Sequence, residues 1–202
     1  AYTRGTLRDG LLQGELILRG SGDPKLVIEN FWLFLRKIRA QGVRDIRGNL
    51  VLDRSAFGDT AIDPALFDGE PLKSYNAGPD ALLLNFHSLA VTFAPDFLSD
   101  RVQVRLDPAL GNYPIRAPQL TIGDCVGDWR VPITATLEAA GASFDGPYAT
   151  GCGEKSWQIH PYALSRNRYL ELVFRQLWSE LGGKFDGTVI DGVVTPDALA
   201  LA

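Results

Sequence analysis

Histidine and cysteine are the scarce side chains of this sequence that could act in catalysis or bind a metal ion. The chain has two histidines, His87 and His160, and either imidazole could serve as the general base for a nucleophile. Neither is accompanied by a serine in a Gly-x-Ser-x-Gly context or by a partner cysteine, so a catalytic triad is unsupported. We expect both histidines to be surface or hydrogen-bonded structural residues.

The two cysteines, Cys125 and Cys152, lie in glycine-rich, loop-like segments. Two buried thiols remain an alternative, but this setting favours a disulfide. Closing the loop would stabilise the fold by about 3–4 kcal/mol, and the bond would imply an oxidising compartment. A redox motif is excluded because no Cys-x-x-Cys occurs, and the spacing does not fit a metal site.

Residues 20–24 read Gly-Ser-Gly-Asp-Pro and stand between an expected strand and an expected helix, where a phosphate-binding loop could form. A dinucleotide-binding fingerprint needs a third glycine, and a P-loop needs Gly-Lys-[Ser/Thr]; both are missing. We therefore expect a structural turn in which Asp23 caps toward the following helix.

Four acidic residues could suggest a calcium loop: Asp53, Asp59, Asp63 and Asp68. They lack the Asp-x-[Asp/Asn]-x-[Asp/Asn]-Gly spacing and the terminal Glu of such loops. We expect a solvated loop instead. The sequence therefore assigns no catalytic, cofactor-binding or metal-binding residue, and no cofactor is implied.

The elements around these residues follow two patterns. An α/β pattern comprises a hairpin of strands at 2–7 and 14–19, a helix at 27–41 and a strand at 47–53. From 87 to 150 the chain instead shows short alternating strands punctuated by Gly and Pro. The α/β pattern then returns, with a helix that begins at 160–161 and is ended by the glycines at 182–183. A strand at 185–194 follows.

These patterns predict an α/β (α+β) body with an inserted all-β subdomain. The body comprises residues 1–86 plus 151–202, and the β subdomain comprises residues 87–150.

Composition narrows the classes of function. The 202 residues carry a formal net charge of −4 and a pI of about 5.2, which argues against a nucleic-acid or anionic-membrane binder. No apolar run approaches the roughly 20 residues that a transmembrane segment needs. The chain has no Met and no signal peptide, and it ends in an apolar stretch at 198–202. We expect a fragment of a longer protein.

Three segments, read together and in order, carry a family resemblance: 16–24, 41–57 and 75–85. They resemble the low-molecular-mass class C penicillin-binding proteins, which are serine D-alanyl-D-alanine carboxypeptidases/endopeptidases. The sequence departs from that family at Leu66-Phe67, where Pro-Gly-Trp is frequent, and at His87, where a second Asn is common. Val27 also replaces the usual Ser or Thr cap.

The active-site motifs of that family are missing. Its enzymes acylate a serine in Ser-x-x-Lys, assisted by Ser-x-Asn and Lys-Thr-Gly motifs. No serine here has a lysine three residues later, and no lysine begins Lys-[Ser/Thr]-Gly. Two Ser-x-Asn strings occur, at 74–76 in a structural loop and at 165–167 early in a helix, and we expect both to be coincidental.

The resemblance implies an insertion within a discontinuous catalytic domain, which lies outside this chain. The chain would then be a non-catalytic accessory region of a periplasmic peptidoglycan peptidase. Its partners would be the catalytic domain of the same polypeptide and, through it, a peptidoglycan peptide. The strands at 3–7 and 189–194 should lie at the same end of the fold, because tolerated insertions have neighbouring ends.

Two other classes remain open. One is an independent periplasmic glycan- or peptide-binding module that uses exposed aromatic residues such as Trp129, Trp157 or Tyr113. The other is a standalone hydrolase with an unrecognised site.

Overall fold

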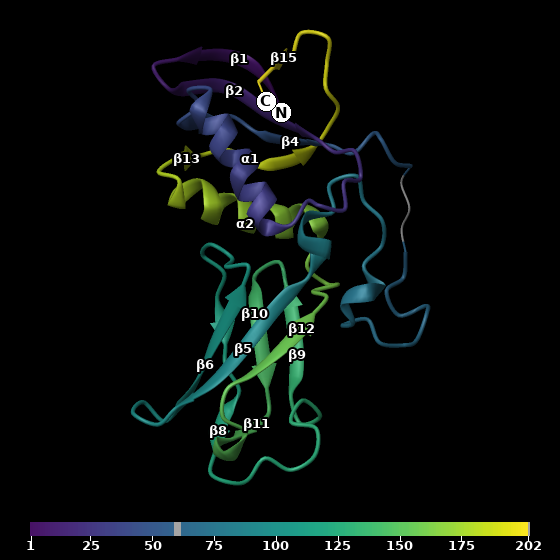
Figure 1. Cartoon of the computed structure of the whole chain (residues 1–202), viewed down its shortest axis with the longest axis vertical. Helices are drawn as coiled ribbons and strands as arrows, with labels where there is room; N and C mark the ends of the chain where they lie inside the picture. The colour runs from purple at the N-terminus through teal and green to yellow at the C-terminus, as the bar shows by residue number, and fades with distance from the viewer. Residues whose placement is uncertain (59–61, 202) are drawn as a thin grey trace. The chain divides into compact units, whose positions relative to one another are not determined.

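The computed structural model describes residues 1–58 and 62–201, and the chain forms two compact units (Figure 1). The first comprises Ala1–Asp63, Gly78–His87 and Arg166–Ala202, and the second comprises Pro64–Ala77 and Ser88–Ser165. The α+β class agrees with the sequence-based prediction, with helices and a mixed sheet in one unit and short strands in the other. The bounds differ from those expected, because 64–77 and 151–165 belong to the second unit.

Long-range pairing explains the different bounds. Strand β12 (Lys155–Ile159) pairs antiparallel with β5 (Leu89–Asp96), which draws the segment after Cys152 into the β-rich unit. The backbone N–H of His160 donates to the carbonyl of Leu72 at 2.8 Å, which holds the 64–77 segment against the same unit.

The first unit begins with the predicted hairpin, formed by β1 (Tyr2–Arg8) and β2 (Leu11–Arg19). Asp9 and Gly10 connect the strands with φ angles of 52° and 83°, as a two-residue turn between twisted strands requires. Strands β3 (Asp45–Arg47) and β4 (Leu50–Asp53) both run parallel to β2. They pair with β2 in the same register.

The strand expected at 185–194 is two short strands, β13 (Lys184–Phe185) and β14 (Val189–Asp191), so that prediction is wrong in its continuity. A row of glycines explains the breaks. Gly5 pairs with Gly14, and a Cβ on Gly48 would lie 2.1 Å from the Gly14 carbonyl oxygen. A Cβ on Gly187 would lie 1.8 Å from the Gly48 carbonyl oxygen. The backbones therefore approach too closely for a side chain.

Two helices cover one face of this sheet (Figure 1). Helix α1 (Ile28–Ala40) connects β2 to β3, and α2 (Arg166–Glu180) leads into β13. Both connections advance in the same direction across the sheet, and right-handed crossovers then place both helices on the same face. Each helix buries large apolar side chains, among them Phe31 and Leu35 of α1 and Phe174 and Trp178 of α2.

The starts of both helices differ from the sequence-based expectations. Helix α2 begins at Arg166 rather than at 160–161, because His160 N–H is bound to Leu72 and Pro161 enters a turn closed by Leu164. Asp23 does not cap α1; its Oδ1 accepts the Lys25 N–H at 2.9 Å. Val27 is the N-cap residue and gives no side-chain hydrogen bond.

The second unit is built from short strands. In one sheet β5 lies between β12 and β6 (Arg101–Asp107), and in another β10 (Gly141–Asp145) lies between β7 (Ile115–Arg116) and β9 (Thr134–Glu138). Strands β8 (Gln119–Thr121) and β11 (Pro147–Ala149) form a parallel pair. Short 3₁₀ turns complete the elements: η1 (Ser74–Asn76) and η3 (Thr150–Cys152) here, and η2 (Leu84–His87) in the first unit.

Aromatic side chains fill the core of the second unit. Phe93 contacts Phe144, Tyr148 and Trp129 with ring centroids 5.0–5.8 Å apart, and Trp129 also contacts Trp157. The expectation that Trp129, Trp157 or Tyr113 is an exposed aromatic residue is therefore wrong: both tryptophans are half-buried. Tyr113 is 7% exposed, and its hydroxyl donates to the Glu138 carbonyl.

The predicted pair Cys125 and Cys152 forms a disulfide, with Cα atoms 4.6 Å apart. The bond lies just beyond the ends of β8 and β11, where Gly151 N–H also donates to the Gly123 carbonyl at 2.9 Å. The crosslink therefore ties together two loops that leave the same parallel strand pair.

The described ends of the chain meet at the edge of the first unit's sheet. Strand β15 (Leu199–Ala200) pairs with β1, and Leu201 N–H donates to the Ala1 carbonyl at 2.9 Å. Strand β14 belongs to the same sheet, separated from β1 by β4 and β2. No helix within 1–58 or 62–201 is both long enough and apolar enough to cross a bilayer.

Candidate functional site

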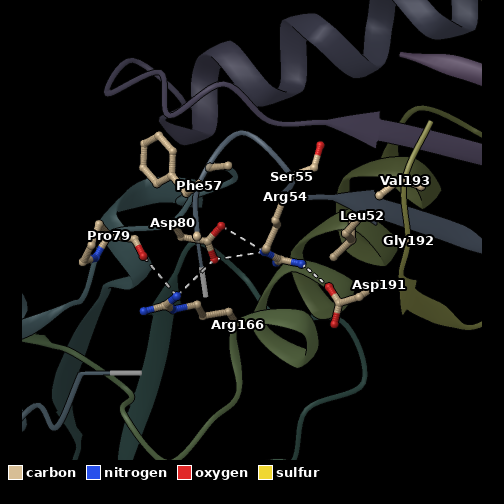
Figure 2. Close-up of a pocket in the computed structure, with 12 residues that line it drawn as sticks. Leu52, Arg54, Ser55, Phe57, Pro79, Asp80, Arg166, Asp191, Gly192 and Val193 are labelled. Atoms are coloured by element: carbon tan, nitrogen blue, oxygen red, sulfur yellow. Dashed lines mark hydrogen bonds and ion pairs between the residues drawn. The ribbon is translucent and has the colours of Figure 1, made fainter. Parts of the chain in front are cut away.

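A cavity of about 390 Å³ opens in the first unit beside the ends of β4 and β14 (Figure 2). Among the described residues, four charged side chains from four segments line it. Arg54 directly follows β4, Asp191 ends β14, Asp80 lies in the segment before η2, and Arg166 begins α2. The sheet and the helix thus bring together charges that are distant in sequence.

Asp80 is at the centre of the charged network, and its side chain is 1% exposed. The Arg54 Nε donates to both Asp80 carboxylate oxygens at 2.9 and 3.0 Å, and the Leu82 N–H donates to Oδ1 at 2.8 Å. Arg54 Nη1 donates to Asp191 at 2.6 Å (Figure 2). Charged hydrogen bonds of this kind offset the cost of burying the carboxylate.

Arg166 and Asn167 extend the network from the start of α2. The Arg166 Nη1 donates to the Pro79 carbonyl at 3.1 Å and lies 3.6 Å from Asp80. The Asn167 amide donates to Asp191 at 2.7 Å. The Ser-x-Asn string at 165–167 therefore contributes to a structural charge network.

The first Ser-x-Asn string, at 74–76, forms η1 in the second unit. The Tyr75 hydroxyl and the Asn76 amide both donate to the exposed Asp68 carboxylate, at 2.5 and 2.8 Å. The Tyr75 hydrogen bond is the largest cause of a lowered Asp68 pKa. This string stabilises its own loop.

Asp53 joins the carboxyl end of β4 to the segment after β14. It is 2% exposed, so the expectation of a solvated loop is wrong for this residue. Its carboxylate accepts the Ser55 N–H at 3.0 Å and the Val194 N–H at 2.8 Å. Burial raises the Asp53 pKa, but the hydrogen bond from the Ser55 hydroxyl, these two backbone hydrogen bonds and the charge of Arg19 together outweigh that effect and hold the pKa below the ordinary value.

The lowered pKa of Asp53 predicts a loss of stability in acid. Because the folded pKa is depressed, its stabilising contribution is present above the unfolded pKa of about 3.9 and is lost as pH falls through the folded pKa. We expect Asp53→Asn to weaken this part of the pH dependence. Hydrogen exchange of the β4 amides between pH 5 and pH 2 measures it, and an unchanged pH profile in the variant would contradict this assignment.

The two histidines are not among the residues that line the cavity. The histidines are not on the surface, since each is 5% exposed. The His87 ring packs 4.9 Å from that of Tyr169, and His160 Nδ1 lies 3.2 Å from the Pro71 carbonyl. Asp59 lies outside the described residues. Within the described ranges, no group of three His, Cys, Asp or Glu side chains is placed to hold a metal ion.

The cavity has the chemistry of a binding or structural site. Two guanidinium groups face two carboxylates, and the nearby hydroxyl of Ser55 hydrogen-bonds to Asp53. No lysine of the described part of the chain lines the cavity beside that serine. The arrangement orders four chain segments and offers polar groups to a ligand.

Comparison with known proteins identifies the family of this chain. The profile of the D-Ala-D-Ala carboxypeptidase 3 (S13) family matches residues 1–194. The chain belongs to this family. The family resemblance found in the sequence is thereby confirmed.

Relatives of this family agree with the match. The chain is 40% identical over 55 residues, 27% of its length, to the D-alanyl-D-alanine carboxypeptidase DacB of Haemophilus influenzae, and this match covers 12% of that protein. The fold is similar to crystal structures of penicillin binding protein 4 (dacB) from H. influenzae. The TM-scores are 0.69, and 0.65 for that protein complexed with a β-lactam, at 20% and 19% identity.

These structural matches cover all of this chain but only 44% and 42% of the solved chains. The chain therefore spans less than half the length of these solved structures.

Proposed function

We propose that this chain is a non-catalytic accessory region of a periplasmic serine-type D-alanyl-D-alanine carboxypeptidase/endopeptidase. The observation that carries the proposal is the S13 family match over 1–194 in a sequence without Ser-x-x-Lys or Lys-[Ser/Thr]-Gly. Acyl-enzyme chemistry needs a serine activated by a nearby base, and none of the serines here has a lysine one helical turn later.

The pairing of β1 with β15 supports an insertion. A region inserted into another domain must leave it and return near the same place. Here Ala1 and Leu201 are joined by a backbone hydrogen bond, so a host domain could receive both ends without distortion. In this proposal the catalytic domain of the same polypeptide is the partner of the region, and a peptidoglycan peptide is the substrate of the whole enzyme.

An independent glycan-binding module is the second candidate. Exposed aromatic rings are its usual contact surface, but Trp129 and Trp157 pack into the aromatic core and Tyr113 is buried. Other aromatic rings are exposed, among them the neighbouring Phe67 and Tyr75, but the three residues expected to serve this module are half-buried or buried.

Labelling with a fluorescent penicillin tests the proposal. The 202-residue protein is expected to form no covalent adduct under conditions in which H. influenzae penicillin binding protein 4 is labelled to completion. Stoichiometric labelling that is lost when one serine is replaced would contradict the proposal, because it would require a complete acylation site within this chain.

A further inference from the structure

A second cavity in the first unit, also about 390 Å³, lies between the end of β2, the loop at 20–26 and α1. We call it the α1 groove. It contains the Gly-Ser-Gly-Asp-Pro loop that the sequence singled out and that the charge network around Asp80 does not use.

The wall of the α1 groove is fixed by the backbone. Gly22 N–H donates to the Ala81 carbonyl at 2.9 Å, and a Cβ on Gly20 would lie 2.3 Å from the same oxygen. The Leu26 carbonyl accepts the Asn85 N–H at 2.8 Å. These contacts hold the loop against the segment at 78–85, so its shape is set before a ligand arrives.

The rim of the α1 groove is cationic. Arg19, Lys25 and Lys37 line it, all three are exposed, and none forms an ion pair with a residue that the structure describes. Asp23 is the one acidic side chain among the described lining residues, and its Oδ1 accepts the Lys25 N–H. Beneath the rim, the charge of Arg19 also contributes to the lowered pKa of the buried Asp53 on the neighbouring strand β4. This rim is positive although the chain as a whole carries a net charge of −4.

Apolar side chains lie beside these charges. Leu33 of α1 is 47% exposed, Leu26 and Phe34 are half-buried, and Phe31 and Leu82 lie buried beneath. The volume is that of a small-ligand site of about 300–1,000 Å³. An α-helix, about 10 Å across with its side chains, needs a longer apolar trough.

We propose that the α1 groove binds a short acidic peptide, with carboxylates at Arg19, Lys25 and Lys37 and small apolar side chains against Leu33 and Phe34. The nature of the peptide rests on the proposed function. A peptide that ends in D-Ala-D-Ala, the substrate in the family's description, offers a terminal carboxylate and two methyl groups. The groove would then bind the carboxyl-terminal end of such a peptide.

A nuclear magnetic resonance titration with the acetylated peptide Ala-Glu-Ala-D-Ala-D-Ala tests this assignment. The amide shifts should move in 19–26 and 33–37. The double variant Arg19→Gln/Lys37→Gln should raise the dissociation constant about fivefold, as expected from removing two exposed charge contacts. Lys155→Gln, which removes one positive charge at an exposed position of β12, should leave the dissociation constant unchanged.

Three results would overturn the proposal. The first is a set of shifts that lies outside the groove. The second is equal binding of the uncharged analogue that carries Gln and a C-terminal amide. The third is a 16-residue acidic peptide that binds at least about tenfold more tightly than the pentapeptide. That result would assign the groove to a protein partner. The penicillin test does not involve the groove, so absence of both labelling and peptide binding would reject the groove and leave the accessory role standing.

Discussion

Replacing Arg54 with methionine is expected to lower the free energy of unfolding of the first unit by about 4 kcal/mol. The cause is Asp80, whose side chain is 1% exposed and would lose the bifurcated hydrogen bond from Arg54 Nε. The Leu82 N–H, and Arg166 at 3.6 Å, would remain as its partners. Removing one partner of a buried pair leaves a charge that the protein interior solvates poorly.

Hydrogen exchange of the β2 and β4 amides measures this change within the first unit. Arg44→Met is a matched control, because Arg44 and Asp45 form an ion pair with side chains that are 58% and 27% exposed. Its effect should stay below about 1 kcal/mol. Adding Asp80→Asn to Arg54→Met should restore part of the loss, since a neutral amide still accepts the Leu82 N–H. Equal effects of Arg54→Met and Arg44→Met would contradict the buried charge network.

Removing the disulfide with Cys125→Ser/Cys152→Ser is expected to lower the stability of the second unit by about 3–4 kcal/mol. The bond closes a loop with a sequence separation of 27, and losing it gives the unfolded chain more conformations. Hydrogen exchange of the β5 amides in urea reports the unfolding of this unit, because the fluorescence of Trp129 and Trp157 overlaps that of Trp32 and Trp178 in the first unit.

Reduction of the unaltered protein should give the same loss, and the first unit should unfold as before. A difference below about 1 kcal/mol, or two free thiols in mass analysis under non-reducing conditions, would contradict the role assigned to the crosslink.

Local chemistry in the sequence predicts those elements that depend on neighbouring residues. The β1–β2 hairpin follows from Asp9 and Gly10, which adopt positive φ angles at little cost. The disulfide follows from the glycine-rich surroundings of Cys125 and Cys152. The hairpin is determined by residues close in the chain, whereas the disulfide joins two loops 27 positions apart and is predicted from the local setting of each cysteine.

Long-range contacts explain what the sequence does not predict. His160-Pro161 has the pattern of a helix start, but the His160 N–H is taken by Leu72, which lies 88 positions earlier. The break between β13 and β14 depends on the close approach of Gly187 to Gly48, which exists only in the assembled sheet.

The charged cavity is hidden from sequence analysis for the same reason. Arg54 meets Asp80 across 26 positions and Asp191 across 137, and neither pair forms a motif with fixed spacing. The one local signal is Arg54 directly after a buried strand, a common place for functional side chains in α/β folds. That position alone does not identify its carboxylate partners.

The central claim is that this accessory region is inserted between the catalytic motifs of one polypeptide. Sequencing the reading frame on both sides of the coding region for these 202 residues tests it most directly. The account predicts Ser-x-x-Lys upstream of Ala1, with Ser-x-Asn and Lys-[Ser/Thr]-Gly downstream, all in one uninterrupted frame. A start codon directly before Ala1 and a stop codon directly after Ala202, or flanking sequence without these motifs, would contradict it.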